Sequence, residues 1–275
     1  MPTNPGFAPA KINLTLHVTG QRDDGYHLLD SLVVFADIGD QVSAMQGSGL
    51  TLNVSGPNAD GIPTDGSNLV IKAAQLLGVD GAALTLEKHL PAAAGIGGGS
   101  SDAAATLRLF SSMWNIPLPS ALSLGADVPV CLSPTCQRMS GIGEVIVKGP
   151  AMPAIPAVLV NPGVHVPTSE IFAALITKDN APMQDQLPDC ATVSDVVAFL
   201  ETCRNDLVHP AIKTAPTIAD VLGAIQSSGA EYSQMSGSGA TCFGIYDSMF
   251  DALDAAEELA EQGWWVQATM LNTKL

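Results

Sequence analysis

The stretch PAAAGIGGGSSDAAATLRLF, residues 91–110, gives the strongest indication of the fold. Its segment 95–99 contains four glycines, which allow a backbone to curl tightly around a ligand. Ser100, Ser101 and Asp102 follow directly, and the residues after them have the apolar spacing of an amphipathic helix. A glycine loop therefore opens onto a helix N-terminus, where N–H groups and the helix dipole favour an anion such as a phosphate.

The register of this loop excludes three familiar nucleotide-binding motifs. A dinucleotide fingerprint, G-x-G-x-x-G, would need glycine at Ser100 or at Asp102. A P-loop needs a Gly-Lys pair, which the chain lacks, and the protein-kinase motifs H-R-D and D-F-G are also absent. Taken alone, a glycine-rich turn of this kind is usually only a strand-to-helix connection, so the rest of the chain has to decide its role.

Before the glycine loop, short alternating or apolar runs predict a sheet-rich first half. The predicted strands are Lys11–Val18, Ser31–Ile38, Gln41–Met45, Leu50–Val54 and Ala83–Glu87. Asn68 is placed to cap a helix that begins at Leu69.

The proline-rich stretch GPAMPAIPAV interrupts helix and strand alike and predicts a domain boundary near residue 152. We therefore expect two domains, 1–152 and 153–275. In the second, a strand is followed by helices from Ser169, Ser194 and Thr217, then by two strands, a helix and a last strand. With the middle helix left out, this is the β-α-β-β-α-β order of a ferredoxin-like domain.

Composition limits the partners of the protein. The 275 residues include 11 Lys and Arg against 27 Asp and Glu, and the formal charge of −16 disfavours nucleic acid and anionic membrane surfaces. No segment has the length and hydropathy of a membrane span or an export signal. The five cysteines contain no C-x-x-C pair, which disfavours both a disulfide framework and a zinc site. We expect reduced thiols in a cytoplasmic protein.

Three further segments accompany the glycine loop, in this order along the chain: APAKINLTLHVTGQRDDGYHLLDS (8–31), LGADVPV (124–130) and MSGSGATCFG (235–244). Together with the loop they resemble the motifs of the GHMP kinases. Lys11-Ile12-Asn13-Leu14 followed by Asp24-Gly25-Tyr26-His27 resembles the branch of this superfamily whose acceptor carries cytidine diphosphate. The Gly-Glu-His sequence typical of mevalonate and galactose kinases is absent.

This resemblance implies an α+β fold of two domains, with an N-terminal domain like domain 2 of ribosomal protein S5, a ferredoxin-like C-terminal domain and an active site between them. It also implies a reaction. ATP would phosphorylate the 2-hydroxyl of 4-diphosphocytidyl-2-C-methyl-D-erythritol, a step in the non-mevalonate route to isoprenoid precursors. Another GHMP kinase, such as a homoserine or mevalonate kinase, and a catalytically silent nucleotide-binding protein remain as alternatives.

The resemblance also implies roles for individual residues. Lys11 and Asp127 match the catalytic lysine and aspartate. The residues matched to ATP binding are Gly95, Gly97, Gly98, Gly99, Ser100, Ser101 and Asn68. Mg²⁺ is implied by ATP chemistry, since a divalent ion neutralises the triphosphate, but the sequence assigns it no ligand.

The residues matched to acceptor binding are Asn13, Tyr26, His27, Thr168 and Phe172. Tyr26 and Phe172 would enclose the cytosine ring, and His27 would hydrogen-bond its edge. Without the motifs, each would be interpreted as an ordinary core or strand residue. The segment from Trp114 to Leu124 is shorter than in many GHMP kinases, which leaves the geometry of the loop before Asp127 open.

Overall fold

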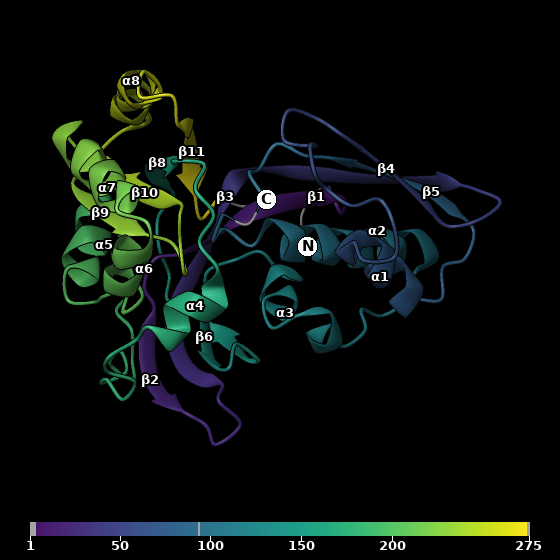
Figure 1. Ribbon diagram of the computed structural model, residues 1–275, viewed down its shortest axis with the longest axis horizontal. Coiled ribbons are helices and arrows are strands. Elements are labelled where there is room, and N and C mark those ends of the chain that lie inside the picture. Colours follow the sequence, from purple (N-terminus) through teal and green to yellow (C-terminus); the bar gives the residue numbers. More distant parts are fainter. Residues whose placement is uncertain (1–3, 93, 274–275) are drawn as a thin grey trace.

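A single long strand, β3 (His27–Gln46), organises the computed structural model, which describes residues 4–92 and 94–273. Within these residues the central order of the sheet is β4-β5-β3-β11-β8-β10-β9 (Figure 1). Strands β1, β2 and β6 also pair with β3, while β7 pairs with β6. Among the strand pairs of the described residues, β4 and β5 alone are parallel and the others are antiparallel.

β3 replaces two predicted strands, because Gly39 and Asp40 do not break it. Gly39 lies opposite Pro9 of β1 (Phe7–Asn13), where a Cβ atom would collide with the carbonyl oxygen of Ala8. Glycine is therefore needed for the close approach of two strands. Asp40 is fully buried and accepts hydrogen bonds from the backbone N–H groups of residues 89 and 90. Both residues look like turn formers in sequence and are used inside the sheet.

The opposite error affects the predicted strand Lys11–Val18. The structure divides this segment between two strands, β1 and β2 (His17–Gln21). Between them the hydroxyl of Thr15 accepts a hydrogen bond from the N–H of Leu32, a bond that a backbone carbonyl would make in a regular ladder. Leu16 donates instead to the carbonyl of Arg204. At Leu16 the chain thus leaves β3 and pairs with Asn205 in the second half of the molecule.

The first half has its helices on one face of its sheet (Figure 1). α1 (Leu69–Leu76) is capped by Asn68, as predicted, and packs against α2 (Gly98–Trp114). α2 begins two residues before Ser100, so the glycine segment forms its first turn. The remaining elements of this half are β4 (Thr51–Ser55), β5 (Ala82–Glu87), a short 3₁₀ helix (Leu122–Leu124), α3 (Val128–Cys131), β6 (Gln137–Gly141) and β7 (Val145–Lys148).

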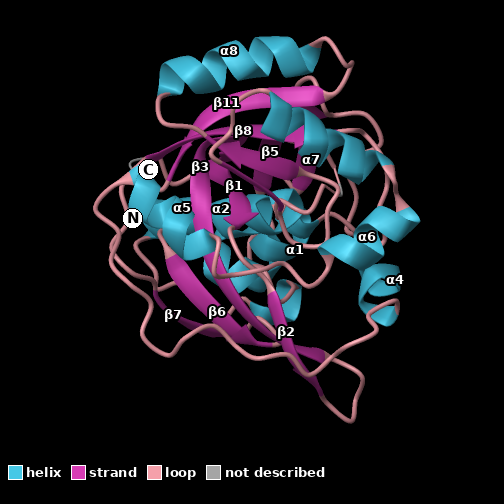
Figure 2. Ribbon diagram, turned by 90° about the vertical axis from the view of Figure 1, so that its left-hand side faces the viewer, coloured by secondary structure: helices cyan, strands magenta, loops and turns pink. Residues whose placement is uncertain are grey.

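The second half confirms the ferredoxin-like prediction. Its elements are β8 (Ile155–Asn161), α4 (Thr168–Ala173), α5 (Val193–Leu200), α6 (Val208–Thr214), α7 (Thr217–Ser227), β9 (Tyr232–Met235), β10 (Cys242–Ile245), α8 (Met249–Ala260) and β11 (Trp265–Leu271). The strand order β11-β8-β10-β9 is antiparallel throughout. α7 and α8 pack on one face, with α8 outermost over β11 (Figure 2), and α5 packs on the other. α6 was not predicted.

The sheet continues across the predicted domain boundary. β8 begins within the proline-rich stretch, at Ile155, and β11 pairs with β3 at Leu271 and Ala36. The main hydrophobic core likewise combines residues of β1 and β3 with residues of β8, β10 and α5. The boundary near residue 152 stays a prediction.

The cysteines behave as the sequence indicates. All five are free thiols, and four of them are buried. Burial raises the pKa of Cys131 to about 12, which keeps this thiol protonated and unreactive at neutral pH. No helix in the described ranges is both long and apolar enough to cross a bilayer.

A buried ion pair fastens the segment after α4 to the sheet. Arg138 on β6 binds both carboxylate oxygens of Asp30 on β3, each at 2.7 Å. Asp30 also accepts from the N–H of Met183 at 2.8 Å, and Arg138 donates to the carbonyls of Gln184 and Asp185. Because Asp30 is only 3% exposed, each charge depends on the other for solvation.

We predict that Asp30→Ala lowers the free energy of unfolding by about 3 kcal/mol, because it leaves Arg138 partly buried without its partner. Asp24→Ala provides the matched control, since the Arg22–Asp24 pair is close to half exposed on both sides. That control should lose less than about 1 kcal/mol. Urea denaturation measures both. Equal losses in the two variants would contradict the assignment of Asp30 as a buried anchor.

Candidate active site

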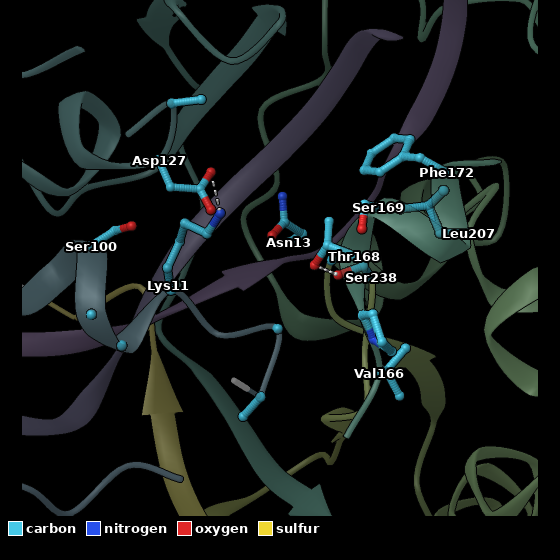
Figure 3. Close-up of a pocket in the computed structure, with 18 of the residues that line it drawn as sticks. Lys11, Asn13, Ser100, Asp127, Val166, Thr168, Ser169, Phe172, Leu207 and Ser238 are labelled. Atoms are coloured by element: carbon cyan, nitrogen blue, oxygen red, sulfur yellow. Dashed lines mark hydrogen bonds and ion pairs between the residues drawn. The ribbon is translucent and has the colours of Figure 1, made fainter. Parts of the chain in front are cut away.

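A cleft of about 1340 Å³ lies between the glycine loop of α2 and the N-terminus of α4. Figure 3 shows Lys11, Asp127 and Ser100 on one side and Thr168, Ser238 and Phe172 on the other, with Asn13 between them. The end near α1 is apolar and includes Ile62, Pro63, Leu69 and Leu86. The opposite end is formed by the β2–β3 hairpin and the residues around α4. Both halves of the chain are needed to form this cleft.

Lys11 and Asp127 form an ion pair in the middle of the cleft, with 2.8 Å between Nζ and Oδ1. Lys11 lies on β1, and its backbone N–H donates to the carbonyl of Ile96, which ties the strand to the glycine loop. Asp127 directly precedes α3. The Lys11 side chain is 4% exposed and the Asp127 side chain 41% exposed, so the carboxylate keeps a face open to a ligand.

The glycine loop holds two residues with left-handed backbone, Gly95 (φ +74°) and Gly97 (φ +65°). A Cβ on Gly95 would lie 2.5 Å from the carbonyl oxygen of Gly239, and one on Gly97 would lie 3.2 Å from Lys11 Cβ and Cε. Gly98 and Gly99 are already helical. Glycine is therefore required for conformation at two positions, while at the next two it keeps the first turn of α2 free of side chains.

The N–H groups that face the cleft are those of Gly98, Gly99 and Ser100, which donate to no other described residue. Ser101 differs from its neighbours. Its N–H donates to Gly97, its hydroxyl donates to the carbonyl of Pro9 at 2.8 Å, and its side chain is fully buried. We therefore remove Ser101 from the predicted phosphate contacts, because it joins α2 to β1 and does not line the cleft.

A buried charge cluster supports the first turn of α2. Lys88 Nζ contacts Asp40 Oδ2, and it lies 3.0 Å from Asp102 Oδ2. Burial, reinforced by the charge of Asp40, raises the pKa of Asp102. Burial alone would lower the pKa of Lys88, but the two carboxylates raise it. Asp102 Oδ1 has no hydrogen-bond partner among the described residues.

At the far end, His27 stacks on Phe172 with ring centroids 5.0 Å apart. The side chain of Tyr26, which is predicted to enclose the cytosine ring together with Phe172, lines the rim of the cleft and is 61% exposed. Burial, and secondly the charge of Lys178, lowers the pKa of His27 and so favours its neutral form. Its Nε2 atom is buried and has no hydrogen-bond partner in the described structure.

The remaining predicted residues also line the cleft. Asn13 donates to the Ser31 hydroxyl at 2.8 Å, and the hydroxyls of Thr168 and Ser238 lie 2.8 Å apart. Asn68 uses both ends of its amide to cap α1 and bind the carbonyl of Pro63, so its role in the structure is to shape the loop at the apolar end.

Several lining residues were missing from the predicted set. Lys88 follows from no sequence motif, because its proximity to Asp102, which directly follows the serines of the glycine loop, depends on how β5 meets α2. His165 and Lys178 lie on either side of α4 in polar loops. Ser238 lies in the MSGSGATCFG segment that resembles a GHMP kinase motif, and its expected role there was to shape the floor of the cleft.

Comparison with known proteins agrees with this geometry. The family model described as GHMP kinases N terminal domain matches residues 68–133, and the model described as GHMP kinases C terminal matches residues 194–263. A crystal structure described as 4-(cytidine 5'-diphospho)-2C-methyl-D-erythritol kinase has a TM-score of 0.74 and 32% identity, covering 97% of this chain and 98% of that one.

Two relatives are more similar in sequence. The 4-diphosphocytidyl-2-C-methyl-D-erythritol kinase of Dinoroseobacter shibae is 56% identical, with 97% of this chain and 94% of the relative covered. That of Cereibacter sphaeroides is 53% identical, with 95% and 96% covered. The chain therefore belongs to the GHMP kinases and, within them, to the 4-diphosphocytidyl-2-C-methyl-D-erythritol kinase family.

Proposed function

We propose that this protein transfers the γ-phosphoryl group of ATP to the 2-hydroxyl of 4-diphosphocytidyl-2-C-methyl-D-erythritol. The observation that carries the proposal is the Lys11–Asp127 pair, which lies between an anion-binding helix N-terminus and an aromatic pocket with a free imidazole nitrogen. The identity to relatives of this name over nearly the whole chain supports the same reaction.

Phosphoryl transfer asks a protein mainly for positioning and charge neutralisation, together with an acceptor for the hydroxyl proton. In our proposal the exposed face of Asp127 accepts the proton of the 2-hydroxyl. The ammonium group of Lys11 orients that carboxylate and neutralises charge on the moving phosphoryl group. Because Lys11 is almost fully buried, its charge acts in a region where water screens it little.

ATP is the phosphoryl donor of the GHMP kinases. We place its phosphates at the free N–H groups of Gly98, Gly99 and Ser100, where the α2 dipole adds to the attraction. The adenine ring would occupy the apolar end of the cleft near Leu69 and Leu86. This orientation directs the γ-phosphate toward Lys11 and Asp127.

The residues at the start of α2 also fit a Mg²⁺ ion, which prefers oxygen ligands and usually keeps several waters. The hydroxyl of Ser100 lines the cleft, and Asp102 Oδ1 is a carboxylate oxygen with no partner in the described structure. The described residues contain no cluster of three metal-binding side chains, so the phosphates of ATP and water would supply most of the ligands. When bound, Mg²⁺ would neutralise the triphosphate.

The acceptor would bind with cytosine at Phe172 and His27. A neutral imidazole can both donate and accept hydrogen bonds, which suits an edge that presents an amino group beside acceptors. The exposed Tyr26 would cover the base from the rim, while Asn13 and Thr168 line the path toward Asp127. For the compartment we propose the cytoplasm, which agrees with the free thiols.

The alternative functions, another GHMP kinase or a nucleotide-binding protein without catalysis, would require different features in this site. A homoserine or mevalonate kinase has no use for an aromatic pocket with a neutral histidine at the acceptor end. A nucleotide-binding protein without catalysis would not need the ion pair of Lys11 with Asp127. Both features therefore favour the proposed reaction.

The direct test is an ATP-consumption assay of the purified protein with four acceptors: the cytidine compound, its uridine analogue, mevalonate and homoserine. We expect the cytidine compound to react with a kcat/KM roughly 10²-fold or more above the uridine analogue, because a polar site rejects an edge that leaves its groups unpaired. The other two should not react. In the product, the new ³¹P signal should show no splitting by a neighbouring proton, since C2 carries a methyl group and no hydrogen. Faster turnover of mevalonate or homoserine would contradict the proposal.

A second prediction concerns Gly97, whose backbone is left-handed and where an added Cβ would lie 3.2 Å from Cβ and Cε of Lys11. Gly97→Ala should lower kcat roughly 10- to 100-fold, because the added methyl displaces the ammonium group that the reaction needs in place. Gly223→Ala is the control: it adds a methyl in open space on helix α7 and should retain wild-type kcat. Steady-state kinetics on folded protein, verified by thermal melting, measures both variants. A Gly97→Ala enzyme with wild-type kcat would show that the loop does not position Lys11.

A further inference from the structure

The lysines that line the cleft in the described part of the chain differ in whether they form an ion pair with a carboxylate. Lys11 is paired with Asp127, and Lys88 with Asp40 and Asp102. Lys178 forms no ion pair with any described carboxylate; its ammonium group donates to Gln21 Oε1 at 3.1 Å. It is half-buried, so it combines access to the cleft with partial removal from bulk water.

The position of Lys178 is fixed by β2. Asn180 donates twice to the carbonyl of Val18, once through its backbone N–H at 3.2 Å and once through its side chain at 3.0 Å. Gln21, the partner of Lys178, is the last residue of β2. The hairpin that follows leads directly to His27, so Lys178 lies at the same end of the cleft as the His27–Phe172 stack. Its charge contributes to the lowered pKa of His27, after burial.

An anionic ligand at this end of the cleft needs a cation. The formal charge of the protein is −16, so the mean field repels a diphosphate. The N-terminus of α2 lies at the other side of the cleft and is directed at the phosphates of ATP. On the acceptor side, the hydroxyls of Thr168 and Ser238 are neutral and hydrogen-bonded to each other, and the carboxylate of Asp24 is paired with Arg22.

We propose that Lys178 binds the diphosphate of the acceptor and thereby selects nucleoside diphosphate esters over uncharged nucleosides. This inference rests on the proposed function. An ammonium group forms charge-assisted hydrogen bonds to phosphate oxygens, which are stronger than those between neutral groups. Because the diphosphate does not react, the contact is the same in the bound ground state and in the transition state, and its loss appears in the acceptor KM rather than in kcat.

The test compares two fragments of the acceptor, cytidine 5'-diphosphate and cytidine, by calorimetry with the adenine site saturated by a non-hydrolysable ATP analogue. Lys178→Gln should weaken the binding of cytidine 5'-diphosphate about tenfold, which corresponds to the loss of one hydrogen bond to a charged group. Cytidine should bind within about twofold of wild type, since it has no phosphate to lose. Lys178→Arg, which keeps the charge, should restore most of the affinity for cytidine 5'-diphosphate.

Two controls distinguish the effect of the Lys178 charge from that of a structural change or of the loss of a remote charge. Gln21→Ala removes the hydrogen bond to Lys178 and keeps its charge, so the preference for cytidine 5'-diphosphate over cytidine should survive. Lys213→Gln removes an exposed charge that does not line the cleft and should leave both affinities unchanged. The proposal is overturned if Lys178→Gln weakens the binding of both fragments equally or of neither. It is also overturned if Gln21→Ala has the same effect on binding as Lys178→Gln.

The same preparations report on the proposed function separately. A wild-type protein that phosphorylates the cytidine acceptor, with an unchanged acceptor KM in Lys178→Gln, refutes only the role of Lys178. A wild-type protein that does not phosphorylate this acceptor refutes the proposed function itself.

Discussion

The ion pair between Lys11 and Asp127 is the constraint on which the rest of the site depends. An ammonium group that is 4% exposed needs a partner, and Asp127 supplies it from a different part of the chain. The backbone N–H of Lys11 donates a hydrogen bond to the carbonyl of Ile96, and the Lys11 side chain packs against Gly97. The position of one lysine therefore couples β1, the glycine loop and the segment before α3. Any ligand that reaches Asp127 does so beside the start of α2.

β3 extends this arrangement to the second half of the molecule. Its first residue, His27, belongs to the acceptor end of the cleft, while Asp40 further along the same strand supports Lys88 under the first turn of α2. Between them, Ala36 pairs with Leu271 of the ferredoxin-like half. A single strand thus sets the separation between the two ends of the cleft. This explains why a cleft formed by both halves can hold a donor and an acceptor in fixed relation.

The sequence predicted those parts of the structure that follow from local patterns. The Asn68 cap, the opening of the glycine loop onto a helix and the ferredoxin-like order all depend on residues close together in the chain. The resemblance to the GHMP kinases brought Lys11 and Asp127 together across more than a hundred positions, which spacing alone could not do.

The errors arose where distant contacts decide the local structure. Gly39 and Asp40 continue a strand because β1 and the backbone after Lys88 approach them there. The hydroxyl of Ser101 is bound to Pro9 because α2 begins earlier than its serines suggest. In each case the residue type permitted two roles, and packing selected one.

The most direct test of the central claim is a double-mutant cycle on kcat with Lys11→Met, Asp127→Asn and the double variant. If the pair acts as one unit, each single variant should lose turnover by roughly 10²- to 10⁴-fold, and the double variant should be about as slow as the slower single one. Thermal melting verifies that all three variants are folded. Losses that multiply in the double variant would mean that Lys11 and Asp127 act independently, and would contradict the role of the pair as one catalytic unit.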